Sequence, residues 1–228
     1  SFNSFQVESL PISNDFLSKE ILYGPSNHPI SVKTVTWGCR TSKLKKVRAA
    51  CICGKDIVSV LNLVVNPSEN FDLPFFGADF VTLPTGHLLA LDLQPVIKSD
   101  LKHTKLVWEK LIPLHQYWQS KLPSGGDIPK EAKSFFSPGF LWTRLPKCDK
   151  SDQLINKVIF SAFNDYLNLY LELVHDAEIV SKKRSEVLLC GQRNYLSYRA
   201  EKDPARSMLT RFYGEEWTES YIHNILFN

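Results

Sequence analysis

The sequence predicts an α+β fold in which one antiparallel sheet is covered by helices on both faces. Three observations lead to this prediction. Strand-like segments follow one another between residues 31 and 95 without a helical period between them. After Asp100 the apolar residues recur at helical spacing, and 43% hydrophobic residues in a chain of 228 suffice for one sizeable core. We therefore expect a single domain over residues 1–228, built as a sandwich.

Five consecutive strands are expected in the first half of the chain. Turn signals separate the segments 31–40, 44–53, 56–65, 74–83 and 87–94. The breaks at Gly54-Lys55 and Thr85-Gly86 are short enough for hairpins, so the strands should form an antiparallel meander. Residues 140–145 should return as one further strand.

Helices are expected in the second half. Apolar side chains at helical spacing predict a helix over 101–122, kinked at Pro113. The clearest period covers 151–180, with Asp152 as the expected N-cap. Two more helices are expected over 192–212, interrupted by Pro204, and over 215–227.

Composition excludes several classes of protein. No apolar run approaches the roughly 20 residues of a membrane-spanning helix, and a net charge of +3 is too small to indicate nucleic-acid binding. Two basic clusters, 43–48 and 182–184, should be solvated faces, with a docking patch for an acidic protein as the alternative. Five cysteines without paired metal or redox spacing should be buried thiols in a reducing compartment.

Known catalytic motifs for nucleotide binding, serine hydrolysis and zinc proteolysis are missing from the sequence. Glu172, His175 and Asp176 have the spacing of metal ligands on a helix. A di-iron bundle needs a second Glu-x-x-His motif, which the chain lacks, so we expect a structural or surface role for these three residues.

Polar side chains are predicted on apolar strand faces. Alternation places Asp79 with Phe75, Gly77 and Val81, and it gives Asn62 and Asp92 similar apolar neighbours. Each could be a satisfied core group, but their concentration in one region favours a pocket. A carboxylic acid whose pKa is raised by burial can donate protons near neutral pH.

Six segments resemble the ferredoxin-dependent bilin reductases. They are LPFFGADFV at 73–81, ALDLQP at 90–95, FLWTR at 140–144, and EKDPAR at 201–206 followed by FYGEEW at 212–217 and ILF at 225–227. Each segment alone is weak, but together they span nearly the whole chain. The resemblance implies a three-layer α/β/α sandwich that binds biliverdin IXα between the sheet and the C-terminal helices.

The resemblance also implies a chemistry. Electrons arrive singly from an acidic [2Fe-2S] ferredoxin, and no cofactor is bound by the enzyme itself. Asp79 and Asp203 match the family's proton donors. Asn62 lines the pigment site, and Arg144 and Arg206 are expected to meet the propionates of the bilin. For each arginine, a surface ion pair is the alternative.

Departures from the family pattern indicate the product. Ala50 and Asn62 stand where phycocyanobilin-forming members carry a Glu and a His, so phycocyanobilin is not expected. The amino-acid sequence of the segments around Asp79 and Asp92 is most similar to that of the plant phytochromobilin synthases, which reduce the A-ring diene system of biliverdin. The alternatives are reduction of the C15 methine bridge to dihydrobiliverdin, and a non-catalytic tetrapyrrole-binding protein.

The remaining expectations also follow from the resemblance. We expect a monomer in the chloroplast stroma, with any transit peptide absent from this chain, and no nucleic-acid or membrane partner.

Overall fold

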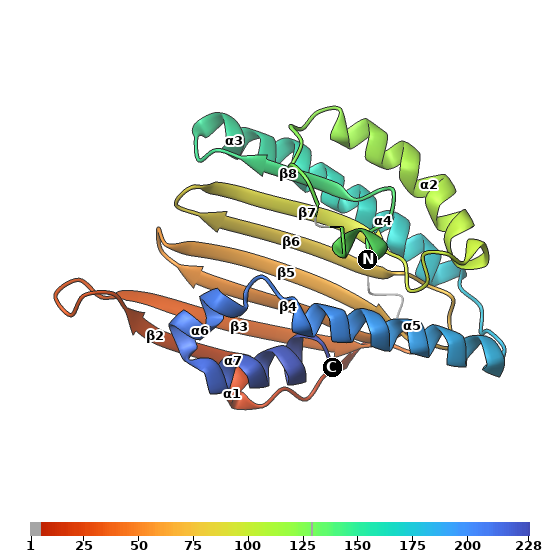
Figure 1. The fold of residues 1–228 in the computed structure, drawn as a ribbon, viewed down its shortest axis with the longest axis horizontal. Coiled ribbons are helices and arrows are strands. Elements are labelled where there is room, and N and C mark those ends of the chain that lie inside the picture. The colour runs from red at the N-terminus through yellow and green to blue at the C-terminus, as the bar shows by residue number, and fades with distance from the viewer. Residues whose placement is uncertain (1–5, 129) are drawn as a thin grey trace.

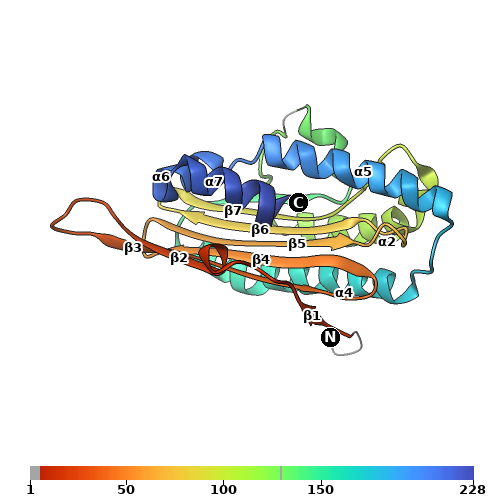
Figure 2. The ribbon, with the colours of Figure 1, turned by 90° about the horizontal axis from the view of Figure 1, so that it is seen from below.

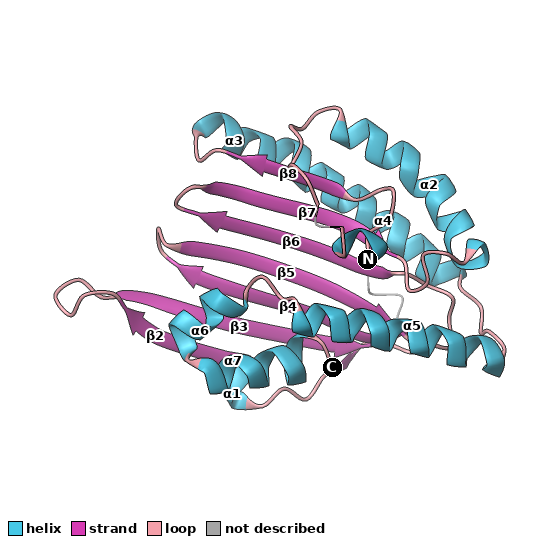
Figure 3. Ribbon diagram, viewed as in Figure 1, coloured by secondary structure: helices cyan, strands magenta, loops and turns pink. Residues whose placement is uncertain are grey.

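An eight-stranded sheet forms the middle layer of the molecule (Figures 1 and 3). The computed structural model describes residues 6–128 and 130–228. Every neighbouring pair of strands is antiparallel, in the order β1-β3-β4-β5-β6-β7-β8, and β2 also pairs with β3. The strands are β1 (Glu8–Ser9), β2 (Ser18–Tyr23), β3 (Ile30–Arg40), β4 (Leu44–Gly54), β5 (Val58–Pro67), β6 (Phe75–Leu83), β7 (Gly86–Gln94) and β8 (Leu141–Leu145).

The predicted meander and the return strand are confirmed. Each expected strand begins and ends within two residues of the observed one. Strands β1 and β2 were not predicted, because β2 is only six residues long and lies at the edge, where it alternates between exposed and half-buried side chains and so lacks a strong apolar signal.

Two helical layers cover the sheet (Figure 2). One face carries the helices that follow β7 and β8, and the other face carries the C-terminal helices. The first layer contains α2 (Leu101–Gln119), α3 (Asp149–Leu154), a π-helical turn (Ile155–Ile159) and α4 (Phe160–Asp176). The second layer contains α5 (Lys182–Glu201), α6 (Arg206–Tyr213), α7 (Glu215–Tyr221) and a π-helical turn (Ile222–Leu226). Two short helices lie outside these layers, α1 (Asn14–Leu17) and a 3₁₀ turn (Ala132–Ser134).

The helix predicted over residues 151–180 has different boundaries at both ends. The helix begins at Asp149 after Cys148, so Asp152 lies in its first turn and is not the N-cap. It ends at Asp176, after which Ile179 pairs with Phe71 as an isolated β-bridge. The apolar period extends past the helix because Ile179 and Val180 lie in extended chain, where the 3.6-residue rule no longer applies.

Helix α5 begins ten residues before the predicted start. Ser181 caps it by accepting a hydrogen bond from the backbone of Arg184. Its first turns expose Lys182 and Lys183, so the segment reads as a polar loop in the sequence. Pro204 separates α5 from α6, as expected.

Arg184 is not part of a solvated face, contrary to the prediction for the cluster 182–184. Its guanidinium is largely buried and pairs with Asp72 and Asp100. Burial alone would raise the pKa of Asp72, but hydrogen bonds from His103 and Arg184 lower it to about 2. This network ties α5 to α2 and to the loop before β6.

Within residues 6–128 and 130–228, none of the helices combines the length and the apolar character needed to span a lipid bilayer.

Candidate functional site

One row of directly paired residues crosses the sheet beneath the C-terminal helices. Thr36 pairs with Ala50, Ala50 with Asn62, Asn62 with Asp79, Asp79 with Ala90, and Ala90 with Trp142. Directly opposite residues of antiparallel strands point to the same face. Ala50 and Ala90, which are both small, therefore flank Asn62 and Asp79 on this face.

The predicted face for Asp79 is confirmed. Phe75 and Val81 of the same strand pack with the C-terminal helices, whereas Phe76 and Ala78 pack into the core on the other side of the sheet. Asp79 itself is half-buried.

A chain of hydrogen bonds runs from β4 to β6 along this face. Nη2 of Arg48 donates to Oδ1 of Asn62 at 2.6 Å, and Nδ2 of Asn62 donates to Oδ1 of Asp79 at 3.3 Å. Arg48 is 1% exposed. The prediction of a solvated face for the cluster 43–48 is therefore wrong at Arg48, because strand alternation turns this residue inward while Lys45 stays exposed.

The Asp79 carboxyl has the electrostatic setting of an acid. Burial raises its pKa above the ordinary value, and the negative charge of Asp203 adds to the rise. Arg199, the hydrogen bond from Asn62 and the charge of Arg48 oppose this change without reversing it. A protonated Asp79 can therefore be held in the site at a higher pH than a solvated Asp would allow.

The helical layer contributes Arg199 from α5 and Asp203 from the connection to α6. Burial lowers the pKa of Arg199, but Tyr195 and the charges of Asp203 and Asp79 raise it more strongly. Arg199 thus lies close enough to interact with both acids. Asp203 also accepts a hydrogen bond from the backbone of Ala205 at 2.8 Å, which fixes its side chain at the start of α6.

The predicted site residues fall into two groups. Asp79, Asn62 and Asp203 lie in one electrostatic cluster. Arg144 is exposed on β8, with its guanidinium 5.3 Å from the ring centre of Trp142. Arg206 pairs with Glu219, which is the alternative considered for it, and it also donates to the backbone carbonyl of Ala200. Contact of either arginine with a propionate stays a prediction.

Asp92 lies on the same face as Asp79 but has structural partners. It is 1% exposed and accepts hydrogen bonds from the backbone and hydroxyl of Ser137. Burial raises the pKa of Asp92 to about 7, although the bonds from Ser137 lower it. Asp92 is therefore a hydrogen-bonded core group, which was one of the two interpretations of its position in the sequence.

The other groups considered from the sequence lie apart from this cluster. Glu172, His175 and Asp176 are exposed, and His175 contacts Asp176 at 2.9 Å. Among the described residues no group of three His, Cys, Asp or Glu side chains has the arrangement of a metal site. The five cysteines are free, but the prediction that they are buried is wrong, because Cys53, Cys148 and Cys190 are exposed and the other two are half-buried.

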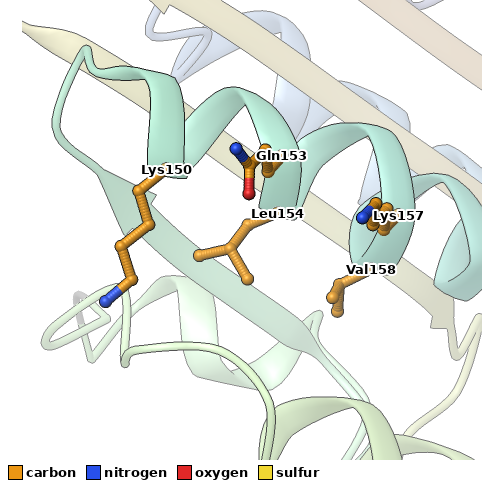
Figure 4. A pocket seen from close by; sticks show the side chains of 5 residues that line it. All are labelled: Lys150, Gln153, Leu154, Lys157 and Val158. Atoms are coloured by element: carbon orange, nitrogen blue, oxygen red, sulfur yellow. The ribbon is translucent and has the colours of Figure 1, made fainter.

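A surface depression on the opposite helical layer lacks the acidic groups of the Asp79 cluster. Figure 4 shows the five side chains of α3 and the following π-helical turn that line it. They are Lys150, Gln153, Leu154, Lys157 and Val158. This set contains no acid, and Leu154 and Val158 pack against the core on the far side of the sheet from Asp79.

Sequence reasoning missed Arg48, Arg199 and Tyr221 as members of the cluster. Arg48 shares a strand face with Ala50 and Ile52, so alternation could have placed it there. Arg199 precedes Asp203 by only four residues, but Asp203 lies beyond the end of α5, so helical spacing could not have placed the two together. Tyr221 gives no comparable signal, since its bond to Thr36 at 2.6 Å joins residues 185 apart in the chain.

Comparisons with known proteins agree with this geometry. The family model described as ferredoxin-dependent bilin reductase matches residues 1–228. The chain is 61% identical over 224 residues to a phycoerythrobilin:ferredoxin oxidoreductase of Prochlorococcus marinus (strain MIT 9211), covering 98% of this chain and 87% of that protein. It is 62% identical over 222 residues to the protein of that name from Synechococcus sp. (strain CC9902), covering 97% and 86%.

A solved structure has the same fold. The crystal structure of phytochromobilin synthase from tomato in complex with biliverdin matches with a TM-score of 0.87 and 28% identity, covering 100% of this chain and 78% of that one. The predicted α+β sandwich is thus confirmed. With a family model that spans the whole sequence and relatives at about 60% identity, the chain belongs to the ferredoxin-dependent bilin reductase family.

Proposed function

We propose that this chain reduces the A-ring diene system of 15,16-dihydrobiliverdin to phycoerythrobilin. The step takes up two electrons, delivered one at a time by reduced ferredoxin, and two protons supplied from the side of Asp79 and Asp203. The observation that carries the proposal is the 61% identity, over 98% of this chain, to a protein named phycoerythrobilin:ferredoxin oxidoreductase.

Phycoerythrobilin differs from the product expected from the sequence. The segments around Asp79 and Asp92 favoured phytochromobilin, yet the phytochromobilin synthase from tomato is only 28% identical to this chain. Relatives of twice that identity carry the name of the phycoerythrobilin enzyme. Because phycoerythrobilin has both a reduced A-ring and a reduced C15 bridge, a precursor whose C15 bridge is already reduced needs only the A-ring step.

The geometry supports the acid-base part of the proposal. In this proposal the pigment lies over Asn62 and Asp79, and the charge of Asp203 acts on Asp79 from the helical layer. Each single-electron reduction makes the pigment more basic, so a nearby acid with a raised pKa can protonate it. The position of the acids then decides which carbon receives the proton.

An anaerobic assay tests the product. The chain is incubated with reduced [2Fe-2S] ferredoxin and, in separate reactions, with biliverdin IXα or 15,16-dihydrobiliverdin, and the products are identified by chromatography and absorption spectra. We expect phycoerythrobilin from dihydrobiliverdin. Phytochromobilin from biliverdin would support the product expected from the sequence, and dihydrobiliverdin from biliverdin would support reduction at C15.

The same assay addresses a non-catalytic role. A protein that only binds tetrapyrroles would form a stable complex spectrum and release no new pigment. Such an outcome with both substrates and active ferredoxin would overturn the proposed function.

We extend the proposal to the remaining expectations from the sequence. The enzyme uses no bound cofactor, since the electrons come from ferredoxin and the protons from carboxylic acids. Arg144 on β8 is the residue we propose for a propionate, because its exposed guanidinium can form charge-assisted hydrogen bonds with a carboxylate. The organisms of the relatives named above are cyanobacteria, so the chloroplast location expected from the sequence stays a prediction.

A further inference from the structure

Arg48 is a buried cation in the sheet beneath the C-terminal helices. It lies in the middle of β4 and is 1% exposed. In the described part of the chain its hydrogen bonds go to Asn62 alone, at 2.6 Å to the side-chain oxygen and 3.4 Å to the backbone oxygen, and its Nε is buried without a partner. A buried arginine without a paired carboxylate is costly, because its charge loses the solvation of water without gaining an opposite charge.

The contact between Arg48 and Asn62 determines how the Asn62 amide is oriented. A guanidinium has only donors, so it must face the amide oxygen. The amide nitrogen of Asn62 then points the other way, towards Oδ1 of Asp79 at 3.3 Å. With the opposite orientation, the Asn62 oxygen would face Asp79 and could accept its proton.

We propose that Arg48 is a positioning residue of the bilin site, which acts through the Asn62 amide to keep the acidic proton of Asp79 on Oδ2, the oxygen that faces away from Asn62. Oδ1 of Asp79 accepts this hydrogen bond, which favours a proton on Oδ2 because the carbonyl oxygen of a carboxylic acid is the better acceptor. Among the described residues no protein group bonds to Oδ2, which leaves this proton available to a ligand. The inference rests on the proposed role of Asp79 as an acid.

The surrounding charges determine the sign of the expected pH effect. Asp79 interacts with Arg48 and Asn62 on the sheet side, and with Arg199 and Asp203 on the helix side. Arg48 itself also faces Tyr221 of α7. Because the charge of Arg48 and the hydrogen bond from Asn62 both lower the pKa of Asp79, removing Arg48 should raise that pKa further.

The test compares Arg48→Met with Arg40→Met. Both changes remove one arginine charge from a strand of the sheet, but Arg40 is exposed and pairs with Glu8 outside the row. Single-turnover loss of bound bilin is followed anaerobically with reduced ferredoxin over a range of pH. For Arg48→Met we expect a rate lower by roughly 10-fold or more. The falling alkaline limb should move up by about one pH unit. Arg40→Met should match the wild type.

Two further variants separate positioning from a structural role. Asn62→Leu removes the amide that transmits the effect, so the double variant should be no slower than Asn62→Leu alone. Arg48→Lys keeps the cation and donors and should recover part of the rate. If Arg48→Met fails to fold, Asn62→Leu and Arg48→Lys test the proposal. An alkaline limb of Asn62→Leu at the wild-type pH would overturn it. A single-turnover rate of Arg48→Lys no higher than that of Asn62→Leu would also overturn it.

Measurements of the melting temperature and of the product distinguish a structural role of Arg48 from a failure of the proposed function. A purely structural Arg48 would lower the melting temperature of Arg48→Met without moving the pH limb, which would contradict the inference. The rates are read from loss of bilin absorbance relative to the wild type. A wild-type product other than phycoerythrobilin would therefore defeat the proposed function while leaving the comparison for Arg48 intact.

Discussion

The two faces of the sheet are built from different kinds of residue. Towards α2, α3 and α4 the strands present a continuous apolar layer that includes Phe76, Leu91 and Leu141, all at most 1% exposed. Towards α5, α6 and α7, strands β4 to β6 present Arg48, Asn62 and Asp79 between small and apolar neighbours. Both faces therefore contribute a hydrophobic core, and the C-terminal face also holds a hydrogen-bonded row of polar groups.

The difference indicates how a reductase can vary its product without losing its fold. Polar groups on the C-terminal face depend on each other through a few hydrogen bonds, so a single substitution there changes the acid. The apolar face is held by close packing, where a change affects stability instead. Four predictions test this division.

The largest effect is expected from Asp79→Asn. The amide has nearly the shape of the acid but no proton to donate, so bilin should still bind while reduction slows by about 100-fold or more. Binding is followed by the bilin absorption spectrum, and turnover by loss of substrate with reduced ferredoxin. Asp79→Asn turning over at the wild-type rate and giving the same product would remove Asp79 from the mechanism.

A core substitution on the opposite face should act on stability. Leu111 of α2 is fully buried, so Leu111→Ala should lower the free energy of unfolding by about 2–5 kcal/mol. Leu106 on the same helix is 69% exposed, and Leu106→Ala should change it by less than about 0.5 kcal/mol. Urea titration measures both. Similar losses in the two variants would show that α2 does not bury the face assigned to it.

The free energy of unfolding should depend on pH through the titration of Asp92. Its pKa is about 7 in the folded protein, above its ordinary value of 3.8, so between these values the folded state holds a proton that the unfolded state has released. This contribution to stability is present below pH 4 and is lost as the pH rises towards 7, at no more than about 1.4 kcal/mol per pH unit.

Asp92→Asn removes that titration. The unfolding free energy of the variant should rise relative to the wild type between pH 4 and pH 7, measured by urea titration at several pH values. A constant difference across this range would mean that Asp92 is ionised throughout.

The smallest effects are expected at the arginines. Arg144 is exposed and has no carboxylate partner among the described residues, so Arg144→Gln should weaken bilin binding by about 5- to 10-fold. Arg206 is already paired with Glu219, so Arg206→Gln should weaken binding less. Spectral titration with biliverdin gives both dissociation constants. A larger loss in Arg206→Gln would reverse the assignment of the propionate site.

Much of the fold could be predicted because its signals are local. Turn residues and alternation located β3 to β8 to within two residues, and alternation also placed Asp79 on the correct face. Edge strand β2 and the start of α5 could not be predicted, because exposed segments carry little apolar periodicity.

The site could be predicted only in part because its contacts join distant segments. Strand order and alternation predicted that Asn62 and Asp79 lie in one region, whereas Asp203 was identified by resemblance alone. Arg48 was misread as solvated, because composition cannot tell which member of a basic run turns inward. Its hydrogen bond to Asn62 exists only once β4 and β5 are paired.

A crystal structure of this chain soaked with biliverdin under anaerobic conditions tests the division between the two faces most directly. The account predicts a bilin between the sheet and α5 to α7, with Oδ2 of Asp79 within hydrogen-bond distance of the pigment and Asp203 on its other side. A bilin bound against α2 and α4, or one on the predicted face but beyond the reach of Asp79, would contradict it.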